Sequence, residues 1–316
     1  MAVNLIRFEH AGRARWGVAL GNGIAPLEGA YVSTAELIAR GEGDWRAAAR
    51  GQASLPIQDV QVLSPVTAPC RVICQGANYR QHMLESGLDP DAKAFNMFFE
   101  KSDASISPPR GAVRRPGHVE LLDYEVELAL VFRQAITGPV TITAENIHEY
   151  VFGLAVANDV SARDVQIPQM QFFKGKSYRG FCPIGPHLTV LEREEFAYLE
   201  QLTLTLAVNG DIRQQDDTRN LVYKPAETIT ELSTFSDLSP GDVLLTGTPS
   251  GCALRIPPPL VRKLMQLLLP EKRFWMAFRS AQAKRGRYLQ PGDVMTASIA
   301  SADRVVDLGE QQVAVA

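Results

Sequence analysis

The sequence predicts a mostly β protein of the α+β class, folded as a sandwich or barrel of strands with few long helices. Short runs rich in Val, Leu, Ile and Thr recur along the chain between Pro and Gly residues, which is typical of strands joined by turns. The one strongly helical stretch comes late, at Leu260–Leu269 and Arg273–Lys284. It separates two similar phrases, Ser239–Val243 and Gln290–Val294, in which a Pro-Gly turn leads into a strand. The helical stretch is therefore predicted to be an insertion between strands of one domain.

The composition is that of an ordinary globular protein and limits the class of partner. The chain has 316 residues, of which 46% are hydrophobic and 21% are charged, enough for a sizeable core. The formal net charge is −3, so nothing indicates a nucleic-acid partner. The apolar runs are far shorter than the roughly 20 residues of a membrane helix, the first residues do not form a signal peptide, and the four cysteines form no C-x-x-C motif. We expect a soluble cytoplasmic protein with neither a membrane nor a nucleic-acid partner.

Residues 1–62 are predicted to form a small N-terminal β domain. Its Ser33 is a candidate helix N-cap, because Glu36 follows three residues later at the start of a helical apolar pattern. The segment from Arg40 to Gln52 is rich in Gly and Ala, and it fits either a helix or a loop. The expected elements before it are strands at 4–8 and 16–20, a hairpin turn at 21–23 and a helix at 33–40.

Residues 63–316 are predicted to form the larger domain, interrupted by the helical insertion at 255–289. The apolar runs in this region are bounded by turn residues at the spacing of a β domain. The predicted strands are Arg71–Cys74, Leu121–Phe132, Val151–Ala157, His187–Val190, Leu202–Val208, Val243–Thr246 and Val294–Ile299.

The strand Leu121–Phe132 is the most informative of these. Because side chains alternate between the two faces of a strand, its even-numbered residues form one wholly apolar face. The other face carries Asp123, Glu125 and Glu127 and then becomes apolar at Ala129. Three acids followed at once by core residues on the same face are unusual for a strand that faces solvent.

Two interpretations of these acids remain open. Edge strands with a solvated acidic face are common, and an E-x-E pair alone is a weak signal. Adjacent like charges repel each other, however, and a divalent cation between Glu125 and Glu127 would neutralise both. Carboxylate oxygens suit hard cations such as Mg²⁺, Mn²⁺ or Ca²⁺.

Asp159 is the candidate third carboxylate. It follows the buried-type strand Val151–Ala157, at the position where polar residues of a site tend to lie because the scaffold fixes their direction. An equally frequent role for Asp159 or Ser161 is to cap a helical turn. Spacing alone leaves both roles open.

His82 and Glu85 are the acid–base candidates. If the chain is helical from Tyr79 onward, the two side chains lie at positions i and i+3 on one face. A carboxylate bonded to one imidazole nitrogen leaves the other nitrogen free to take a proton from water. The alternative is a surface His–Glu pair with little energetic weight.

Two later segments carry groups suited to an anionic substrate. Lys174–Ser177 contains lysines that are either solvated or directed at an anion. Leu245–Gly251 is a Gly-punctuated turn after a strand, and its backbone amides and hydroxyls suit a carboxylate in the manner of an anion nest. Taken alone, each of these patterns is weak.

Taken together, the chain resembles the fumarylacetoacetate hydrolase family. Six phrases occur in the order of that family and extend from about Val60 to the C-terminus, apart from the helical insertion. A set of six ordered phrases is far more specific than any one of them. The matching phrases are Ile73–Glu85, Leu122–Val131, Asn158–Gln166, Gly175–Pro186, Val208–Gly210 and Leu238–Gly251.

The resemblance implies a fold and a set of roles. It implies a mixed β-sandwich or roll as the catalytic domain, a small N-terminal β domain and a homodimer. It also implies that Mg²⁺ or Mn²⁺, with Ca²⁺ as an alternative, is held by three carboxylates. The implied residues are Glu125, Glu127 and Asp159 for the metal, His82, Glu85 and Lys176 for catalysis, and Tyr79, Arg163, Gln166 and Thr248 for the substrate.

The reaction that the resemblance implies is metal-dependent hydrolysis of a C–C bond in a 2,4-diketo acid such as an acylpyruvate or fumarylpyruvate. His82 would deprotonate water and Lys176 or Gln166 would steady the oxyanion. The same enolate chemistry serves an oxaloacetate-type decarboxylase or a keto–enol isomerase, so both stay open. A catalytically silent protein that binds a small keto acid is the third alternative.

Three features depart from the family pattern. Arg179 stands where many relatives carry an acid, and Ala77 replaces a bulkier apolar residue. The insertion at 255–289 is unusual for the family, and its apolar content fits contact with a partner subunit, a substrate mouth or its own domain.

Overall fold

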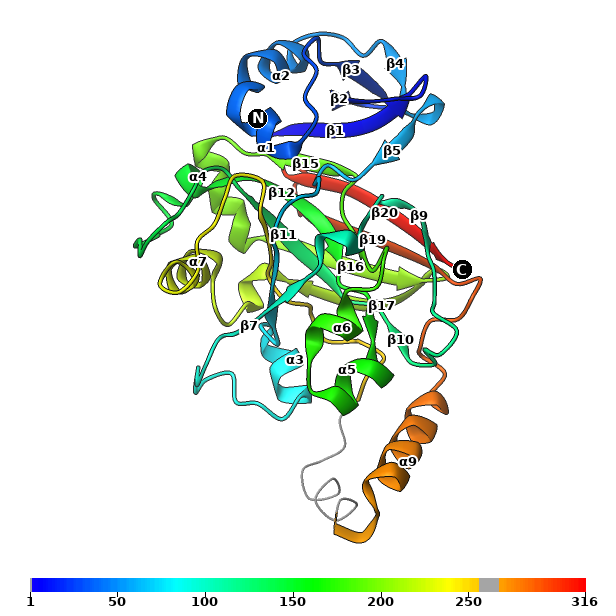
Figure 1. Cartoon of the computed structure of the whole chain (residues 1–316). Helices are drawn as coiled ribbons and strands as arrows, with labels where there is room; N and C mark the ends of the chain where they lie inside the picture. The colour runs from blue at the N-terminus through cyan, green and yellow to red at the C-terminus, as the bar shows by residue number, and fades with distance from the viewer. Residues whose placement is uncertain (1, 256–266) are drawn as a thin grey trace.

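The computed structural model describes residues 2–255 and 267–316. In Figure 1 the N-terminal strands lie at one end of the molecule and helix α9 (Glu271–Ala283) projects at the other. The predicted helical segment Leu260–Leu269 falls largely outside the described residues. Among the described α-helices only α9 exceeds nine residues, which confirms the predicted mostly β architecture with few long helices.

The largest sheet has eleven strands and extends through both halves of the chain. Its members are β1 (Val3–His10), β2 (Arg13–Leu20), β3 (Gly23–Pro26), β4 (Leu55–Pro56), β5 (Gln61–Leu63), β6 (Val72–Gly76), β7 (Met97–Lys101), β11 (Val126–Phe132), β12 (Val151–Asn158), β15 (His187–Val190) and β18 (Val243–Leu245). Their spatial order is β4-β3-β2-β1-β15-β12-β11-β18-β6-β7, with β5 paired to β1. The strands predicted in this part of the chain are therefore present.

A second sheet packs against it. Its five strands, in the order β17-β16-β19-β20-β9, are β9 (Arg110–Val113), β16 (Leu202–Val208), β17 (Asp211–Asp217), β19 (Val294–Ser301) and β20 (Asp307–Val315). Two short pairs complete the strands, β8 (Ile106–Ser107) with β14 (Cys182–Pro183) and β10 (Leu122–Asp123) with β13 (Ser161–Ala162). The predicted sandwich thus forms from segments on both sides of the insertion.

Short helices connect the strands. The α-helices besides α9 are α1 (Thr34–Arg40), α2 (Glu42–Ala49), α3 (Arg80–Glu85), α4 (Ile147–Tyr150), α5 (Arg163–Gln169), α6 (Phe172–Lys176) and α7 (Pro225–Ser233). Short 3₁₀ helices are η1 (Ile57–Asp59), η2 (Asp103–Ser105), η3 (Arg193–Glu200) and η4 (Thr218–Asn220). Helices α3, α5 and α6 lie at the end of the molecule opposite the N-terminal strands (Figure 1).

The N-terminal unit follows the predicted pattern. The hydroxyl of Ser33 accepts a hydrogen bond from the backbone N–H of Glu36 and caps α1 as expected. The segment after Arg40, which the sequence left open, forms helix α2. Strand β1 pairs with β15 of the following region, so one sheet crosses the predicted boundary near residue 62. That boundary stays a prediction.

Strand β11 lies between two hydrophobic cores and confirms the predicted period of two. Val126, Leu128 and Leu130 belong to the core between the two sheets. Ala129 and Val131 face the other core, which contains Trp16 and Trp45 of the N-terminal unit. A strand that is buried on both faces has no freedom to slip, because a shift of one residue would exchange its faces. The two cores therefore fix where Glu127 points.

The prediction of one continuous strand over Leu121–Phe132 is wrong in one respect. The chain leaves the ladder at Tyr124 and Glu125, so that β10 pairs with β13 whereas β11 pairs with β12. Side chains satisfy the freed backbone groups: the N–H of Glu125 donates to Asn158 Oδ1 at 3.0 Å and that of Val126 to Gln214 Oε1 at 3.0 Å. Local periodicity cannot report such partners, because they lie far away in the sequence.

The described part of the insertion packs on its own chain. Phe274 and Phe278 of α9 are buried, and the ring of Trp275 contacts both of them. Met276 on the same helix is 61% exposed. No helix of residues 2–255 or 267–316 is both long enough and apolar enough to span a bilayer.

Asn78 is expected to contribute strongly to stability, because its buried amide joins two loops. Its Nδ2 donates to the carbonyl oxygens of Tyr223 and Thr246 at 3.0 Å each, and its Oδ1 accepts from the N–H of Tyr223 at 2.8 Å. We expect Asn78→Ala to lower the free energy of unfolding by about 2–4 kcal/mol, because buried backbone groups lose their partners. Urea denaturation would measure this, with the exposed Asn220→Ala as control. Equal losses in both variants would contradict the assignment.

Candidate active site

One cavity of about 240 Å³ lies where β6, α3, α5, α6 and the start of β11 meet. Most of the site residues predicted from the sequence line it. The lining residues used below are His82, Glu85, Glu125, Glu127, Arg163, Gln166, Lys176, Thr248 and Leu254, together with Met97 and Phe99. Residues from seven separate segments of the sequence therefore meet in one small volume.

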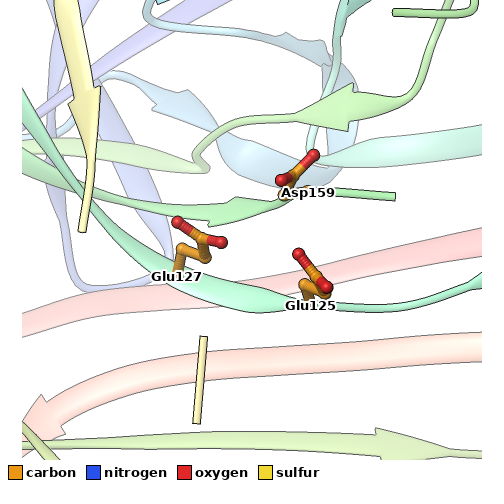
Figure 2. Close-up of side chains that lie close together, drawn as sticks. All are labelled: Glu125, Glu127 and Asp159. Carbon is orange, nitrogen blue, oxygen red and sulfur yellow. The ribbon is translucent and has the colours of Figure 1, made fainter. Parts of the chain in front are cut away.

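Three carboxylates form a cluster, called the floor of the site below, and two of them, Glu125 and Glu127, line this cavity. One oxygen from each of Glu125, Glu127 and Asp159 lies within 4.8 Å of the others. Figure 2 shows the side chains grouped around a common space, two from the β11 segment and Asp159 from beyond the end of β12. All three residues are at most 5% exposed. The interpretation of Glu125 and Glu127 as a solvated acidic face is therefore wrong.

Asp159 does not cap a helix. Helix α5 begins after Ala162 and has no side-chain cap, and the hydroxyl of Ser161 donates to the backbone carbonyl of Asp159 at 2.8 Å. The backbone N–H of Asp159 donates to the carbonyl of Glu125 at 2.8 Å, which joins the two acidic segments directly. The capping alternative is wrong because a short strand, β13, separates Asp159 from the helix.

Three buried cations surround the carboxylates. Lys176 Nζ donates to Glu125 Oε2 at 2.7 Å and also to Asp159. Lys101 Nζ donates to Asp159 Oδ1 at 2.5 Å and to the carbonyl of Phe181 at 2.9 Å. Burial lowers the pKa of Lys176, but the carboxylates of Asp159 and Glu125 raise it by a larger amount. The pKa is therefore above its usual value, and the side chain stays positively charged.

Arg163 is oriented by Asp123, the third acid of the predicted strand. Its Nε donates to Asp123 Oδ2 at 2.8 Å, its Nη1 donates to Gln166 Oε1 at 2.8 Å, and its Nη2 donates to Glu125. Arg163 and Gln166 lie at positions i and i+3 on α5 and so share one face. Burial raises the pKa of Glu125, but Arg163 and Lys176 outweigh it and lower this pKa to about 2.

The charges do not balance, and the excess is negative. The buried carboxylates are Asp123, Glu125, Glu127 and Asp159, and the buried cations are Lys101, Arg163 and Lys176. Glu127 alone lacks a basic side chain at ion-pair distance within the described residues, and its Oε2 accepts only the N–H of Gly247, at 2.8 Å. Burial and the carboxylates of Asp159 and Glu125 raise its pKa well above the usual value.

This donor set fits a hard divalent cation. Mg²⁺, Mn²⁺ and Ca²⁺ prefer carboxylate oxygens, and a cation among the three carboxylates would offset the repulsion that raises the pKa of Glu127. Glu125, Glu127 and Asp159 would hold the ion. The geometry does not choose between these metals.

The turn after β18 binds one of the three clustered carboxylates. The sequence predicted that its backbone amides bind a carboxylate, and the N–H of Gly247 binds the protein's own Glu127. Gly247 has φ +89°, and a Cβ there would lie 2.9 Å from that of Asn78, so both the conformation and the space require glycine. Thr248 lines the cavity, while its hydroxyl donates to the carbonyl of Val126 at 2.9 Å.

His82 and Glu85 both line the cavity from α3, but no described hydrogen bond joins them. Glu85 instead forms an ion pair with Arg255, at the start of the insertion. Burial lowers the pKa of His82, against the attraction of Glu125, so its imidazole stays neutral to lower pH than usual. The predicted dyad thus has both members at the cavity, with the carboxylate bound to another residue.

Tyr79 is a predicted substrate-binding residue that does not line the cavity. It is completely buried in the core between the sheets. The sequence interpretation missed Lys101 and Arg255 and gave Asp123 no role. Asp123 had a signal, because it shares the strand face of Glu125 and Glu127, whereas the two cations are lone basic residues with no motif around them.

Comparisons with known proteins show which sequences and folds this chain resembles. A family model described as the C-terminal part of fumarylacetoacetate (FAA) hydrolase matches residues 71–316. The chain is similar to the mitochondrial oxaloacetate tautomerase Fahd2a of Rattus norvegicus, with 36% identity over 233 residues that make up 72% of each chain.

Two solved structures are similar over almost the whole chain. A fumarylacetoacetate hydrolase from psychrophilic Exiguobacterium antarcticum has 30% identity and a TM-score of 0.71, over 99% of both chains. A probable 2-hydroxyhepta-2,4-diene-1,7-dioate isomerase from Mycobacterium abscessus has 31% identity and a TM-score of 0.72, over 99% of this chain and 98% of that one.

The raised pKa of Glu127 predicts how metal binding depends on pH. A proton and a cation compete for this carboxylate, so the metal-free protein favours the protonated form and becomes less stable as the pH rises through the raised pKa. We expect the increase in Tm caused by Mg²⁺, relative to EDTA, to grow as the pH rises from 4.5, the ordinary pKa of glutamate, through the raised pKa of Glu127. Differential scanning fluorimetry would measure it.

Glu127→Gln removes both the ligand and the titrating group, and should abolish the Mg²⁺ effect at every pH. The exposed Glu149→Gln is the matched control and should retain the effect. An increase in Tm that shrinks as the pH rises, or that persists in Glu127→Gln, would contradict the assignment of this ligand.

Proposed function

The chain belongs to the fumarylacetoacetate hydrolase family, as its sequence motifs predicted, and on that premise we propose that it is a metal-dependent keto–enol tautomerase of a small 2-keto acid of the oxaloacetate type. The observation that carries the proposal is the state of the acid–base pair at the cavity. His82 is free to move a proton, whereas Glu85 is bound to Arg255 and not to the imidazole. Tautomerisation removes one proton from the enol oxygen and adds one at C3, and it requires no activated water.

Two of the three similar proteins reported above support the same class of reaction, whereas the third is described as a hydrolase. The rat protein at 36% identity is named an oxaloacetate tautomerase, and the solved M. abscessus structure at 31% identity is described as a probable isomerase. Both names denote a change within one molecule. The small size of the cavity, about 240 Å³, supports a substrate with few carbon atoms.

Arg163 and Gln166 are suited to hold the acid end of the substrate. The guanidinium of Arg163 has five N–H groups, and the described hydrogen bonds use three of them. Asp123, Glu125 and Gln166 fix its plane, so the remaining N–H groups have a set direction. A planar guanidinium held in this way is pre-organised for the carboxylate or keto oxygen of a 2-keto acid.

The proposed proton transfer depends on His82. A neutral imidazole takes the proton from the enol hydroxyl and returns a proton to C3, and the reverse sequence forms the enol. Glu125, Glu127 and Asp159 would hold a divalent cation, and its positive charge would stabilise the negative charge that develops on the substrate oxygen. Lys176 adds a permanent positive charge at the same floor, because its contacts with Asp159 and Glu125 keep it protonated.

One wall of the cavity is apolar. Phe99 lines the cavity, and its ring lies 5.1 Å from Lys176 Nζ and 5.1 Å from the ring of Phe172, which also lines it. An apolar wall beside a charged floor strengthens the electrostatic interactions made there. It also limits the access of water to the enolate.

Hydrolysis of a 2,4-diketo acid is the second candidate function. The observation that favours it is that His82 and Glu85 both line the cavity, so that a side-chain movement of Glu85 would restore the water-activating pair. An oxaloacetate-type decarboxylase remains a third candidate, because the same floor would stabilise the enolate formed by loss of CO₂.

A substrate panel tests the proposal. The enol form of oxaloacetate, oxaloacetate itself and acylpyruvates are supplied with EDTA and then with Mg²⁺ or Mn²⁺. We expect metal-dependent loss of the enol absorbance, faster than the uncatalysed rate, with no acid fragment released. Release of pyruvate and an acid from an acylpyruvate would instead establish the hydrolase, and CO₂ release would establish the decarboxylase.

His82→Ala is expected to lower kcat for the tautomerisation by about 10²- to 10⁴-fold, the usual contribution of a positioned acid–base group. In the wild-type protein, loss of activity toward acid pH should occur below 6.5, the ordinary pKa of histidine, because burial lowers the pKa of His82. The exposed His118→Ala is the control and should retain full activity. Unchanged kcat in His82→Ala would assign the proton transfer to another group.

A further inference from the structure

The start of the insertion reaches the rim of the cavity. Leu254 lines the cavity, and the guanidinium of Arg255 forms an ion pair with Glu85, which lines it too. The side chain of Arg255 is 36% exposed and that of Glu85 is 24% exposed, so solvent reaches both partners. This contrasts with the floor, where the side chains of Lys101 and Asp159 are fully buried.

Two buried side chains hold this segment in place. The carboxylate of Asp123, which also orients Arg163, accepts the N–H groups of Ala253 at 2.8 Å and of Leu254 at 3.1 Å. Gln282 of α9 is 4% exposed; its Nε2 donates to the carbonyl of Arg255 at 2.7 Å, and its Oε1 accepts the N–H of Arg255 at 3.3 Å.

A tyrosine fixes Gln282 in turn. The hydroxyl of Tyr288 donates to Gln282 Oε1 at 2.9 Å and is buried. The insertion therefore places the backbone of Arg255 through specific hydrogen bonds, while leaving its charged side chain at the rim. A side chain anchored in this way has a defined position and an exchangeable partner.

Arg255 differs from the other cations of the site in what it is free to bind. Lys101, Lys176 and Arg163 each form ion pairs with buried carboxylates. If one of these cations left its carboxylate to bind a ligand, a buried negative charge would remain unpaired. The Arg255–Glu85 pair is half-exposed, and such pairs contribute little to stability. Exchange of Glu85 for another carboxylate therefore costs little.

We propose that Arg255 binds the distal carboxylate of the substrate and that Glu85 occupies this position until the substrate displaces it. The inference rests on the proposed function and adds the residue that selects a second acid group. A guanidinium binds a carboxylate through two parallel hydrogen bonds, which gives direction as well as attraction. The floor takes the 2-keto acid end and the rim takes the other end, so dicarboxylic 2-keto acids are selected over those with an uncharged end.

Binding of a ligand that cannot react tests this directly. The probes are 3,3-difluoro-oxaloacetate, which has no C3 hydrogen to move, and its 4-methyl ester, which lacks only the distal charge. Titration calorimetry with Mg²⁺ present measures both dissociation constants. We expect the wild-type protein to bind the diacid about 10- to 100-fold more tightly than the ester. We expect Arg255→Gln to lose this preference and to bind the ester as before.

Glu85→Gln separates recognition from a merely structural ion pair. Without its charge, Glu85 no longer competes for Arg255, so the diacid should bind more tightly than to the wild-type protein. Arg279→Gln is the matched control, because Arg279 lies on α9, is 38% exposed and pairs with Glu120. It should leave both dissociation constants unchanged. Arg255→Lys keeps the charge and should retain part of the preference.

The outcomes distinguish this inference from the proposed function. If the wild-type protein prefers the diacid, and Arg255→Gln does not, the inference stands even when no tautomerisation is observed. If enol-oxaloacetate is turned over but Arg255→Gln keeps the preference for the diacid, the inference is overturned and the tautomerase stands. Weaker binding of the diacid to Glu85→Gln would overturn it too, since it would show that Glu85 supports the site.

Discussion

The burial of four carboxylates at the ends of β10, β11 and β12 is the constraint on which the rest of the site depends. A carboxylate taken out of water is costly unless cations and hydrogen-bond donors replace its hydration. Lys101 from β7, Arg163 from α5 and Lys176 from α6 supply the charge, and the N–H of Gly247 supplies a donor. Elements far apart in the sequence are therefore tied together by the same few oxygens.

The compensation is incomplete at one point, and that point defines the chemistry. Glu127 faces two other carboxylates and has a raised pKa, so the cluster favours either a proton or a cation there. The sheet on both sides of β11 keeps Glu127 on the face of the other carboxylates, because its neighbours are packed into two cores. Because the fold holds the three carboxylates close together, their mutual repulsion persists and favours the binding of a divalent ion between them.

The strands were predictable from local patterns in the sequence, whereas those patterns left the roles of the three carboxylates open and the family resemblance grouped them. The alternation of residues with a period of two predicted the buried face of β11. The position of Asp159 directly after a buried strand made it a candidate site residue. The break at Tyr124 and Glu125 was not predictable, because its backbone groups are satisfied by Asn158 and Gln214, which are distant in sequence. Lys101 was not predicted for the same reason. It is a lone lysine at the end of a strand, and its buried partner Asp159 is distant in the sequence.

The site has a buried floor, whose rearrangement would cost much free energy, and a partly exposed rim, whose rearrangement would cost little. Every floor cation holds a buried charge, so exchanging any of them for a substrate group would leave an uncompensated ion. At the rim, Arg255 and Glu85 are both reached by solvent and exchange partners without that penalty. A change of reaction on this floor would therefore require only a rearrangement of the rim. In this chain Glu85 pairs with Arg255 and not with His82, and on the proposed function no water molecule needs to be activated beside the enolate.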